Sequence, residues 1–305
     1  MKIYYLKNKD IDLDKWNECI KNSFNGIVYA YSWYLDIVNE EWEALVDENY
    51  TRVMPLTIAN KYKINYLHQP YFTQQLGVFS TQILNSEIVA RFVEAIPTKY
   101  RFYELNLNTF NKLENYKYEL TKNITYELDL ISNYEKTLQN YSTNTKRNLK
   151  KATTNKISVL TGIQPNDLIN LFINNNENKL IKVTNEHYDT IRKIMSTALR
   201  YQIGEILGAY NEKNELCSAA FFITSHHKSI YLFAASSESG KETGANFKLI
   251  DTFIQKYSGL HLTLDFEGSN IDGLARYYSS FGAKPCEYYR IKKNLLPWYI
   301  KIFKP

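Results

Sequence analysis

Residues 236–246 read Ser-Ser-Glu-Ser-Gly-Lys-Glu-Thr-Gly-Ala-Asn and join a strand-like stretch, 229–235, to a helix-like one, 246–257. In the second stretch Phe247, Ile250 and Phe253 recur at helical spacing. The joining segment can hold an anion, because glycines let the backbone fold back, Lys241 supplies a cation, and a helix beginning at Asn246 presents free N–H groups and the positive end of its dipole. The alternative is a simple strand-to-helix turn with an Asn cap.

The segments around this turn predict an alternation of strands and helices in the second half of the chain. The strands are 157–160, 205–210, 217–224, 229–235, 262–267 and 287–292, and the helices are 165–174, 187–199, 246–257 and 272–280. The first half offers a weaker version of the same order. Its helices are 16–20, 31–38 and 86–95, and its strands are 42–46, 52–59, 64–67, 75–79, 102–107 and 124–130.

A helical connector separates the two halves. Ser132 and Glu135 fit a capping box, and Thr143-Asn144 can cap a second helix. The 305 residues suit two cores, since domains cluster near roughly 100–150 residues. We therefore expect an α/β domain over 1–130, the connector over 131–155, and a second α/β domain over 156–305.

Composition narrows the class of protein. Hydrophobic residues make up 44% and charged residues 23%, as in globular proteins. The N-terminus meets Lys7 and Lys9 too soon for a secretory signal, and no stretch approaches the roughly 18 apolar residues of a membrane span. Cys19, Cys217 and Cys286 are an odd number, far apart in sequence and without CxxC spacing, which argues against a disulfide framework and against a zinc ribbon. We expect a cytoplasmic protein without a metal site.

Charge and glycine are unevenly distributed. Residues 1–140 hold 15 Lys and Arg against 18 Asp and Glu, whereas residues 141–305 hold 22 against 14. Of the 11 glycines, only Gly26 and Gly77 precede residue 161. If the protein has an anionic ligand, we therefore expect it in the second half. No GxSxG, GxxxxGK[ST] or GxGxxG motif points to a serine hydrolase, a P-loop or a dinucleotide-binding fold.

The order of elements in the second half resembles the GNAT acyltransferase fold, and two motifs sharpen the resemblance. Lys241-x-x-Gly244-Ala245-Asn246 is similar to the Gln/Arg-x-x-Gly-x-Gly/Ala loop that holds the pyrophosphate of acyl-CoA, with Lys first and Asn last. The segment from Tyr278 to Gly282 resembles that family's Tyr-x-x-x-Gly-Phe segment, in which a helical Tyr protonates the departing thiolate.

Taken whole, the chain is more similar to a double-GNAT branch, the FemA/FemB/FemX-like peptidoglycan-bridge transferases. The segments that carry this resemblance are 147–152, 234–237, 244–246, 264–269 and 278–282, and more loosely 69–71 and 74–77. It implies an α/β fold of two tandem GNAT-like domains, each a mixed, mostly antiparallel sheet flanked by helices. This chain lacks the long coiled-coil insertion of some bridge-forming members.

The resemblance also implies an activity, the transfer of an acyl group from acyl-CoA, or of an amino acid from aminoacyl-tRNA, to an amine. The setting would be the synthesis of cell-wall or surface-polysaccharide precursors. The donor is a co-substrate, and no tightly bound cofactor is implied. Six residues would hold the donor: Ser236, Ser237, Lys241, Gly244, Ala245 and Asn246.

Three candidate catalytic residues come after segment 236–246 in the sequence. Asp265 and Glu267 alternate onto one face of strand 262–267, so either carboxylate could take a proton from the attacking amine. Tyr278 would protonate the leaving group. Backbone N–H groups near 235–237, if a bulge frees them, would stabilise the oxyanion. The alternatives are that Glu267 caps a turn, Asp265 pairs with a Lys or Arg, and Tyr278 packs its helix on the sheet.

Basic residues in the connector suggest where the acceptor binds. Arg147, Lys150 and Lys151 lie at i, i+3 and i+4, on one side of a helix, and could hold phosphates of a lipid-linked precursor or of a tRNA acceptor end. The resemblance adds Tyr71 and Gln74 as candidate substrate-binding residues. The alternative for the basic residues is a solvated helix face. The tail, 295–304, mixes apolar and basic residues and either touches a membrane surface or packs against a domain.

Two other functions remain open. A non-catalytic GNAT-like module could use its basic residues to bind nucleic acid or anionic lipid, with an affinity that falls steeply with salt. A sugar N-acyltransferase would keep the fold and change only the acceptor.

Overall fold

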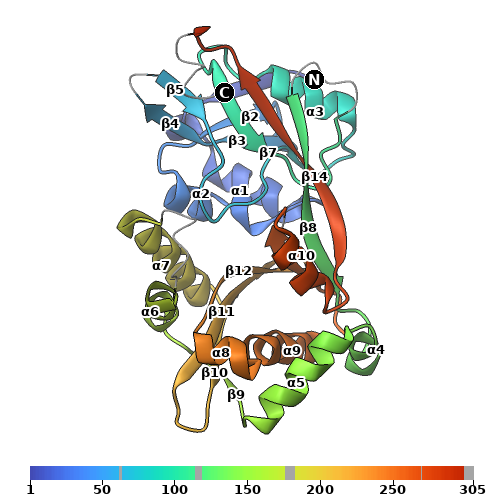
Figure 1. Cartoon of the computed structure of the whole chain (residues 1–305). Helices are drawn as coiled ribbons and strands as arrows, with labels where there is room; N and C mark the ends of the chain where they lie inside the picture. The colour runs from blue at the N-terminus through green and yellow to red at the C-terminus, as the bar shows by residue number, and fades with distance from the viewer. Residues whose placement is uncertain (62–63, 114–118, 176–182, 269, 299–305) are drawn as a thin grey trace. The chain divides into compact units, whose positions relative to one another are not determined.

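The structure is a computed structural model that describes residues 1–61, 64–113, 119–175, 183–268 and 270–298 (Figure 1). The chain forms two compact units, one of Met1–Ile124 with Cys286–Pro305 and one of Thr125–Pro285. This division differs from the boundaries expected from sequence, because β14 (Lys284–Asn294) returns to the first unit and pairs there with β7 (Phe102–Asn106).

The first unit contains a four-stranded antiparallel sheet in the order β1 (Ile3–Leu6), β2 (Glu43–Asp47), β3 (Arg52–Leu56) and β6 (Phe79–Ser80). A second group of strands holds β4 (Ile58–Lys61), β5 (Ile64–Leu67), β7 and β14. The helices are η1 (Asn8–Asp10), α1 (Leu13–Asn22), η2 (Val28–Ala30), α2 (Ser32–Val38) and α3 (Ser86–Glu94). The predicted strand 52–59 is therefore two strands, β3 and β4, which belong to different sheets.

The second unit is built on a mostly antiparallel sheet in the order β8 (Glu119–Asp129), β13 (Thr263–Gly268), β12 (Lys228–Ser236), β11 (Leu216–Ser225), β10 (Gly204–Tyr210) and β9 (Ser158–Thr161). Only β12 and β13 pair in parallel within it. Its helices are α6 (Pro165–Asn175), α7 (Asn185–Arg200), α8 (Glu238–Thr243), α9 (Ala245–Tyr257) and α10 (Asp272–Ser279). The predicted α/β class is confirmed, with α8 added where a turn was expected.

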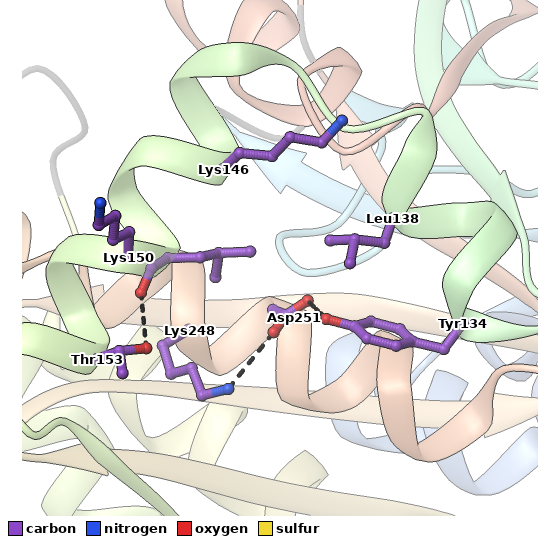
Figure 2. A pocket seen from close by; sticks show the side chains of 8 residues that line it. Tyr134, Leu138, Lys146, Lys150, Thr153, Lys248 and Asp251 are labelled. Atoms are coloured by element: carbon purple, nitrogen blue, oxygen red, sulfur yellow. Dashed lines mark hydrogen bonds and ion pairs between the residues drawn. The ribbon is translucent and has the colours of Figure 1, made fainter.

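The connector forms two helices, α4 (Tyr134–Gln139) and α5 (Thr143–Thr154), capped by the side chains of Asn133 and Ser142. The expected caps at Ser132 and Thr143 are therefore displaced by one residue each. Both connector helices approach α9 around Asp251, whose carboxylate accepts a hydrogen bond from the hydroxyl of Tyr134 at 2.8 Å (Figure 2). It also accepts one from Tyr141, which lies between α4 and α5, at 3.2 Å.

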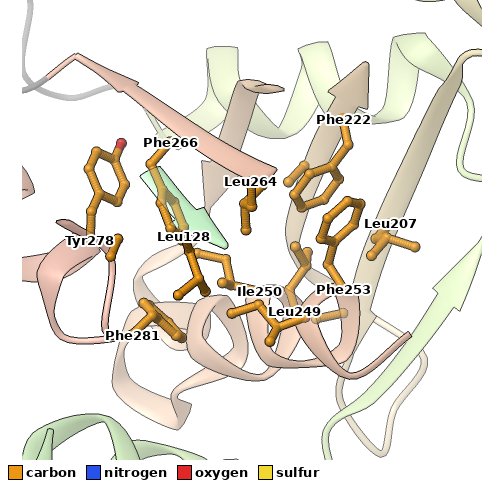
Figure 3. Packing of buried hydrophobic residues seen from close by; sticks show 14 of the residues in the cluster. Leu128, Leu207, Phe222, Leu249, Ile250, Phe253, Leu264, Phe266, Tyr278 and Phe281 are labelled. Atoms are coloured by element: carbon orange, nitrogen blue, oxygen red, sulfur yellow. The ribbon is translucent and has the colours of Figure 1, made fainter. Parts of the chain in front are cut away.

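The core of the second unit lies between the sheet and helices α9 and α10. Phe222 of β11 stacks on Phe253 of α9, with ring centroids 3.9 Å apart, and Phe266 of β13 stacks on Tyr278 of α10 at 4.9 Å (Figure 3). Leu264 between them is fully buried. The alternation of strand 262–267 predicted this apolar face, and the packing fixes α10 beside the end of β13.

Membrane-spanning helices, metal-ligand clusters and disulfides are all missing from the part of the chain that the structure describes. No helix there is long and apolar enough to cross a bilayer. No group of three or more His, Cys, Asp or Glu side chains in those residues is placed to hold a metal ion. None of Cys19, Cys217 and Cys286 forms a disulfide.

Candidate active site

Strands β12 and β13 separate shortly after they meet. They pair in parallel only from Lys228 to Ile230, against Thr263 to Asp265. Beyond that point β12 continues to Ser236 without β13 beside it, and a pocket of about 450 Å³ opens between the strands. This β12–β13 pocket is lined by Tyr231, Leu232, Phe233, Ala234, Ala235, Ser236, Asn246, Phe266, Glu267, Gly268, Leu274, Tyr277 and Tyr278.

A β-bulge lies in the wall of this pocket. On β12, Tyr231 faces Phe222 and Phe233 faces Phe221, so Leu232 between them has no residue opposite on β11. A bulge interrupts the ladder and turns backbone groups out of it. The bulge is therefore at Leu232, three residues before the start of the expected range 235–237, and the N–H of Ser237 is bonded to the carbonyl of Cys217 at 2.9 Å.

Glu267 enters the pocket because the backbone of β13 changes course. Its φ of 57° lies in the left-handed region, and the pairing of β13 with β8 is irregular between Asp265 and Gly268. Its Oε1 atom is buried and has no hydrogen-bond partner in the described residues. Burial raises the pKa of this carboxyl to about 8, so it can take up and release a proton near neutral pH.

Asp265 lies outside the pocket and is fully engaged. It is 1% exposed, and its Oδ1 accepts hydrogen bonds from Thr125 Oγ1 at 2.5 Å and from the Glu267 N–H at 2.9 Å. Its Oδ2 pairs with Lys228 Nζ at 3.4 Å. Burial alone would lower the pKa of Lys228, but Asp265 and Glu127 together raise it. The expectation that both carboxylates share one face of the site is therefore wrong, and Asp265 takes the alternative role of ion-pair partner.

Two neighbouring tyrosines of α10 complete the polar end of the pocket. The ring of Tyr278 packs on Phe266 while its hydroxyl points away from the core (Figure 3). Burial, and to a lesser extent the charge of Glu267, raises the pKa of Tyr278, so the phenol stays protonated. Burial likewise raises the pKa of Tyr277, and the hydroxyls of Tyr231 and Tyr278 raise it further.

Three buried polar atoms of the pocket share one property. Glu267 Oε1, Asn246 Oδ1 and Tyr277 Oη have no hydrogen-bond partner among the residues described. Leaving a buried polar atom unpaired costs about 1–3 kcal/mol, so proteins keep few of them. Their concentration in one pocket fits a polar ligand that would pair with them.

Of the six residues predicted to hold the donor, two line the β12–β13 pocket, Ser236 and Asn246. Ser237 instead caps α8, accepting from the Gly240 N–H at 3.1 Å, and Lys241 is exposed and pairs with Glu238 at 3.1 Å. The expected open turn is therefore wrong, because residues 238–243 form a helix, whereas binding of the donor's phosphates by these residues stays a prediction.

The other two predicted donor residues, Gly244 and Ala245, are closely packed against neighbouring atoms. Gly244 joins α8 to α9 with a φ of 77°, and a Cβ there would lie 2.6 Å from the carbonyl oxygen of Asn148 on α5. Ala245 is fully buried. Close contact with α5 explains why the chain has a glycine at this point.

Of the three basic residues predicted to bind the acceptor, only Lys150 lines a pocket. This second pocket, of about 360 Å³, lies between α4, α5 and α9, and Arg147 and Lys151 of the same helix do not line it. This basic pocket is lined by Tyr134, Leu138, Lys146, Leu149, Lys150, Thr153, Lys248 and Asp251. Tyr71, which is 53% exposed, and Gln74 belong to the first unit. Of the predicted tail, residues 299–304 lie outside those described, and within 295–298 Leu296 is buried.

Sequence reasoning missed several residues of the β12–β13 pocket, chiefly Tyr231, Leu274 and Tyr277. Leu274, Tyr277 and Tyr278 stand at i, i+3 and i+4 on α10, so one helical face carries all three. That spacing was a usable signal once Tyr278 had been chosen. Tyr231 gave no such signal, because its role depends on the separation of β12 from β13.

No protein-family model matches this chain, and no curated protein matches it in sequence. Solved structures do match. FemX has a TM-score of 0.66 at 14% identity, over 99% of this chain and 100% of that one. A conserved protein of unknown function from Bacteroides thetaiotaomicron has a TM-score of 0.61 at 11% identity, over 96% and 100%. L-PGS from Bacillus licheniformis has a TM-score of 0.56 at 9% identity, over 96% and 94%. The chain therefore has the fold of FemX, which confirms the fold expected from its resemblance to the FemA/FemB/FemX-like proteins.

Proposed function

We propose that this protein is a transferase that moves an acyl or aminoacyl group to an amine in the β12–β13 pocket. The observation that carries the proposal is Glu267, whose carboxyl has a buried, unpaired oxygen and a pKa raised to about 8, in a pocket that also holds the protonated Tyr278. A base that works near neutral pH and an acid within one pocket are what amide formation from an activated acyl group requires. The shared fold with FemX supports this reaction class.

In the proposed reaction, Glu267 accepts a proton from the acceptor amine as its nitrogen attacks the acyl carbonyl carbon. A C–N bond forms, and the carbonyl oxygen carries negative charge in the tetrahedral intermediate. Backbone N–H groups around the bulge at Leu232 would stabilise that oxyanion. The C–S bond of a thioester or the C–O bond of an aminoacyl ester then breaks, and Tyr278 gives its proton to the departing atom.

Donor and acceptor follow from the same proposal. The donor is an acyl-CoA or an aminoacyl-tRNA, held at least by Ser236 and Asn246 in the pocket wall. The acceptor is an amine on a cell-wall, surface-polysaccharide or lipid precursor. Similarity in fold to FemX and to L-PGS supports this setting.

A transfer assay tests the proposal. The protein is incubated with labelled acetyl-CoA, longer acyl-CoAs or charged tRNA and with amine acceptors, and new amides are measured by mass spectrometry. We expect amide formation with one of the two donor classes. Lack of product with both, together with nucleic-acid or lipid binding that falls steeply with salt, would favour the non-catalytic module instead.

A further inference from the structure

The basic pocket shares no residue with the β12–β13 pocket. Lys146 and Lys150 stand one turn apart on α5, and Lys248 reaches the pocket from α9 (Figure 2). Leu138 and Leu149 form its apolar part and pack against the core of the second unit. The pocket is therefore a concavity on packed helices.

Positive charge exceeds negative charge here. Asp251 is the one acidic residue that lines the basic pocket, and it is 2% exposed. Its Oδ1 is occupied by two tyrosine hydroxyls and its Oδ2 pairs with Lys248 at 3.5 Å. The carboxylate therefore positions Lys248 and leaves the charges of Lys146 and Lys150 uncompensated.

The ammonium groups of Lys146 and Lys150 on α5 differ in their hydrogen bonds. Lys146 Nζ donates to the carbonyl of Gln139 at 3.0 Å, a neutral acceptor that leaves its charge available. Lys150 Nζ has neither a hydrogen bond nor a carboxylate partner within the described residues. Figure 2 shows the side chains of Lys146 and Lys150 extending in different directions from α5, so both must turn on their flexible stems to bring their ammonium groups to an anion beside Lys248.

Lys248 lies near the N-terminus of α9, whose second residue, Asn246, lines the β12–β13 pocket instead. The first turn of α9 contains no acidic residue and its N-cap, Gly244, offers no side chain. A cation near a helix N-terminus opposes the macrodipole, and Lys248 is the fourth residue of α9. An anion bound beside Lys248 would relieve that unfavourable arrangement.

We propose that the basic pocket binds the phosphate group of a small soluble molecule, such as a phosphomonoester or a diphosphate, through Lys146, Lys150 and Lys248. A concavity of about 360 Å³ suits such a group better than a flat lipid surface or a nucleic-acid backbone. The proposal stands independently of the reaction assigned to the β12–β13 pocket.

Helix α5 supplies a matched test. Lys146→Gln with Lys150→Gln removes two charges inside the pocket, and Arg147→Gln with Lys151→Gln removes two exposed charges of the same helix outside it. Binding of inorganic pyrophosphate is measured by calorimetry at constant ionic strength. We expect the first pair to weaken binding by about tenfold or more, as the loss of charge-assisted hydrogen bonds does, and the second pair to leave it nearly unchanged. Lys146→Arg with Lys150→Arg should largely restore it.

Two results would overturn the proposal. One is absence of pyrophosphate binding by the wild-type protein, and the other is an equal loss in both double variants, which would mean a diffuse basic face. Vesicles of phosphatidylglycerol and a short RNA hairpin serve as further probes. Vesicle binding that pyrophosphate displaces would assign the phosphate to a lipid headgroup in the same pocket. Vesicle or RNA binding that both double variants weaken equally would count against the pocket.

Discussion

Replacement of Glu267 by Gln is expected to lower kcat by about 10²- to 10⁴-fold, the usual contribution of general acid–base catalysis, with little change in KM. Glutamine keeps the size of the side chain but cannot accept the proton of the attacking amine. The measurement is the initial rate of amide formation with the donor identified by the transfer assay. An unchanged kcat would remove Glu267 from the mechanism.

Asp265→Asn is the matched control for this variant, because the two carboxyls are two residues apart in sequence but only Glu267 lines the pocket. We expect Asp265→Asn to keep most of the turnover at a temperature where it remains folded. It should lose stability, since Lys228 would lose the more buried of its two acidic partners, Asp265 and Glu127. A loss of turnover in Asp265→Asn alone would assign the base to Asp265.

The raised pKa of Glu267 predicts a particular pH dependence. With a pKa of about 8, only about one such carboxyl in ten is ionised at pH 7, so kcat/KM should rise with pH and level off above about 8.

The folded protein also binds this proton more tightly than the unfolded chain, so stability should fall as pH rises from about 4.5 to about 8. Between these two pH values the free energy of unfolding of the wild type should fall by about 1.4 kcal/mol per pH unit. Glu267→Gln should abolish that fall, so at pH 8 the variant should be more stable than the wild type.

Phe253→Ala is expected to destabilise the second unit by about 3–5 kcal/mol, the usual cost of deleting a buried phenyl ring. Phe253 is fully buried, stacks on Phe222 at 3.9 Å and packs against Tyr257 at 4.6 Å. Without its ring, α9 would lose much of its contact with the sheet. Urea unfolding followed by circular dichroism measures the change.

Phe24→Ala is the control for this stability prediction. Phe24 is 53% exposed and its ring meets Phe110 edge to face at 5.6 Å, so its loss should change stability by only about 1 kcal/mol. If the two variants had similar stabilities, the packing of α9 described above would be incorrect.

Periodicity in the sequence predicted the regular elements of the second unit well. The apolar positions of α9 and the alternation of β13 are strong local signals, and both elements pack as expected. The partner of β14 could not be predicted, because pairing with β7 is a long-range contact that leaves no local pattern. The strand 52–59 was predicted as one for a similar reason, since nothing in its composition marks the change of sheet at Thr57.

The candidate site was harder to predict than the fold. Strict alternation placed Asp265 and Glu267 together, but the left-handed backbone at Glu267 breaks that alternation, and a glutamate gives no warning of a positive φ. Ser237 was expected to contact the donor, yet a serine before a short polar segment is equally a helix cap.

Helical spacing likewise grouped the cations of α5 correctly on one helix but could not tell which side faces α9. Lys146 and Lys150 face it, and Lys248 joins them only through tertiary packing.

The most direct test of the central claim, that the β12–β13 pocket holds an acyl donor, is thermal unfolding of the wild type and of Leu274→Trp with acyl-CoAs and a stable aminoacyl-nucleoside analogue. Leu274 lines the pocket and is 39% exposed, so a larger side chain can obstruct the pocket while the protein stays folded. A donor at 100 times its Kd should stabilise the wild type by about 2.7 kcal/mol and Leu274→Trp far less. No stabilisation by any donor, or equal stabilisation of both proteins, would contradict the claim.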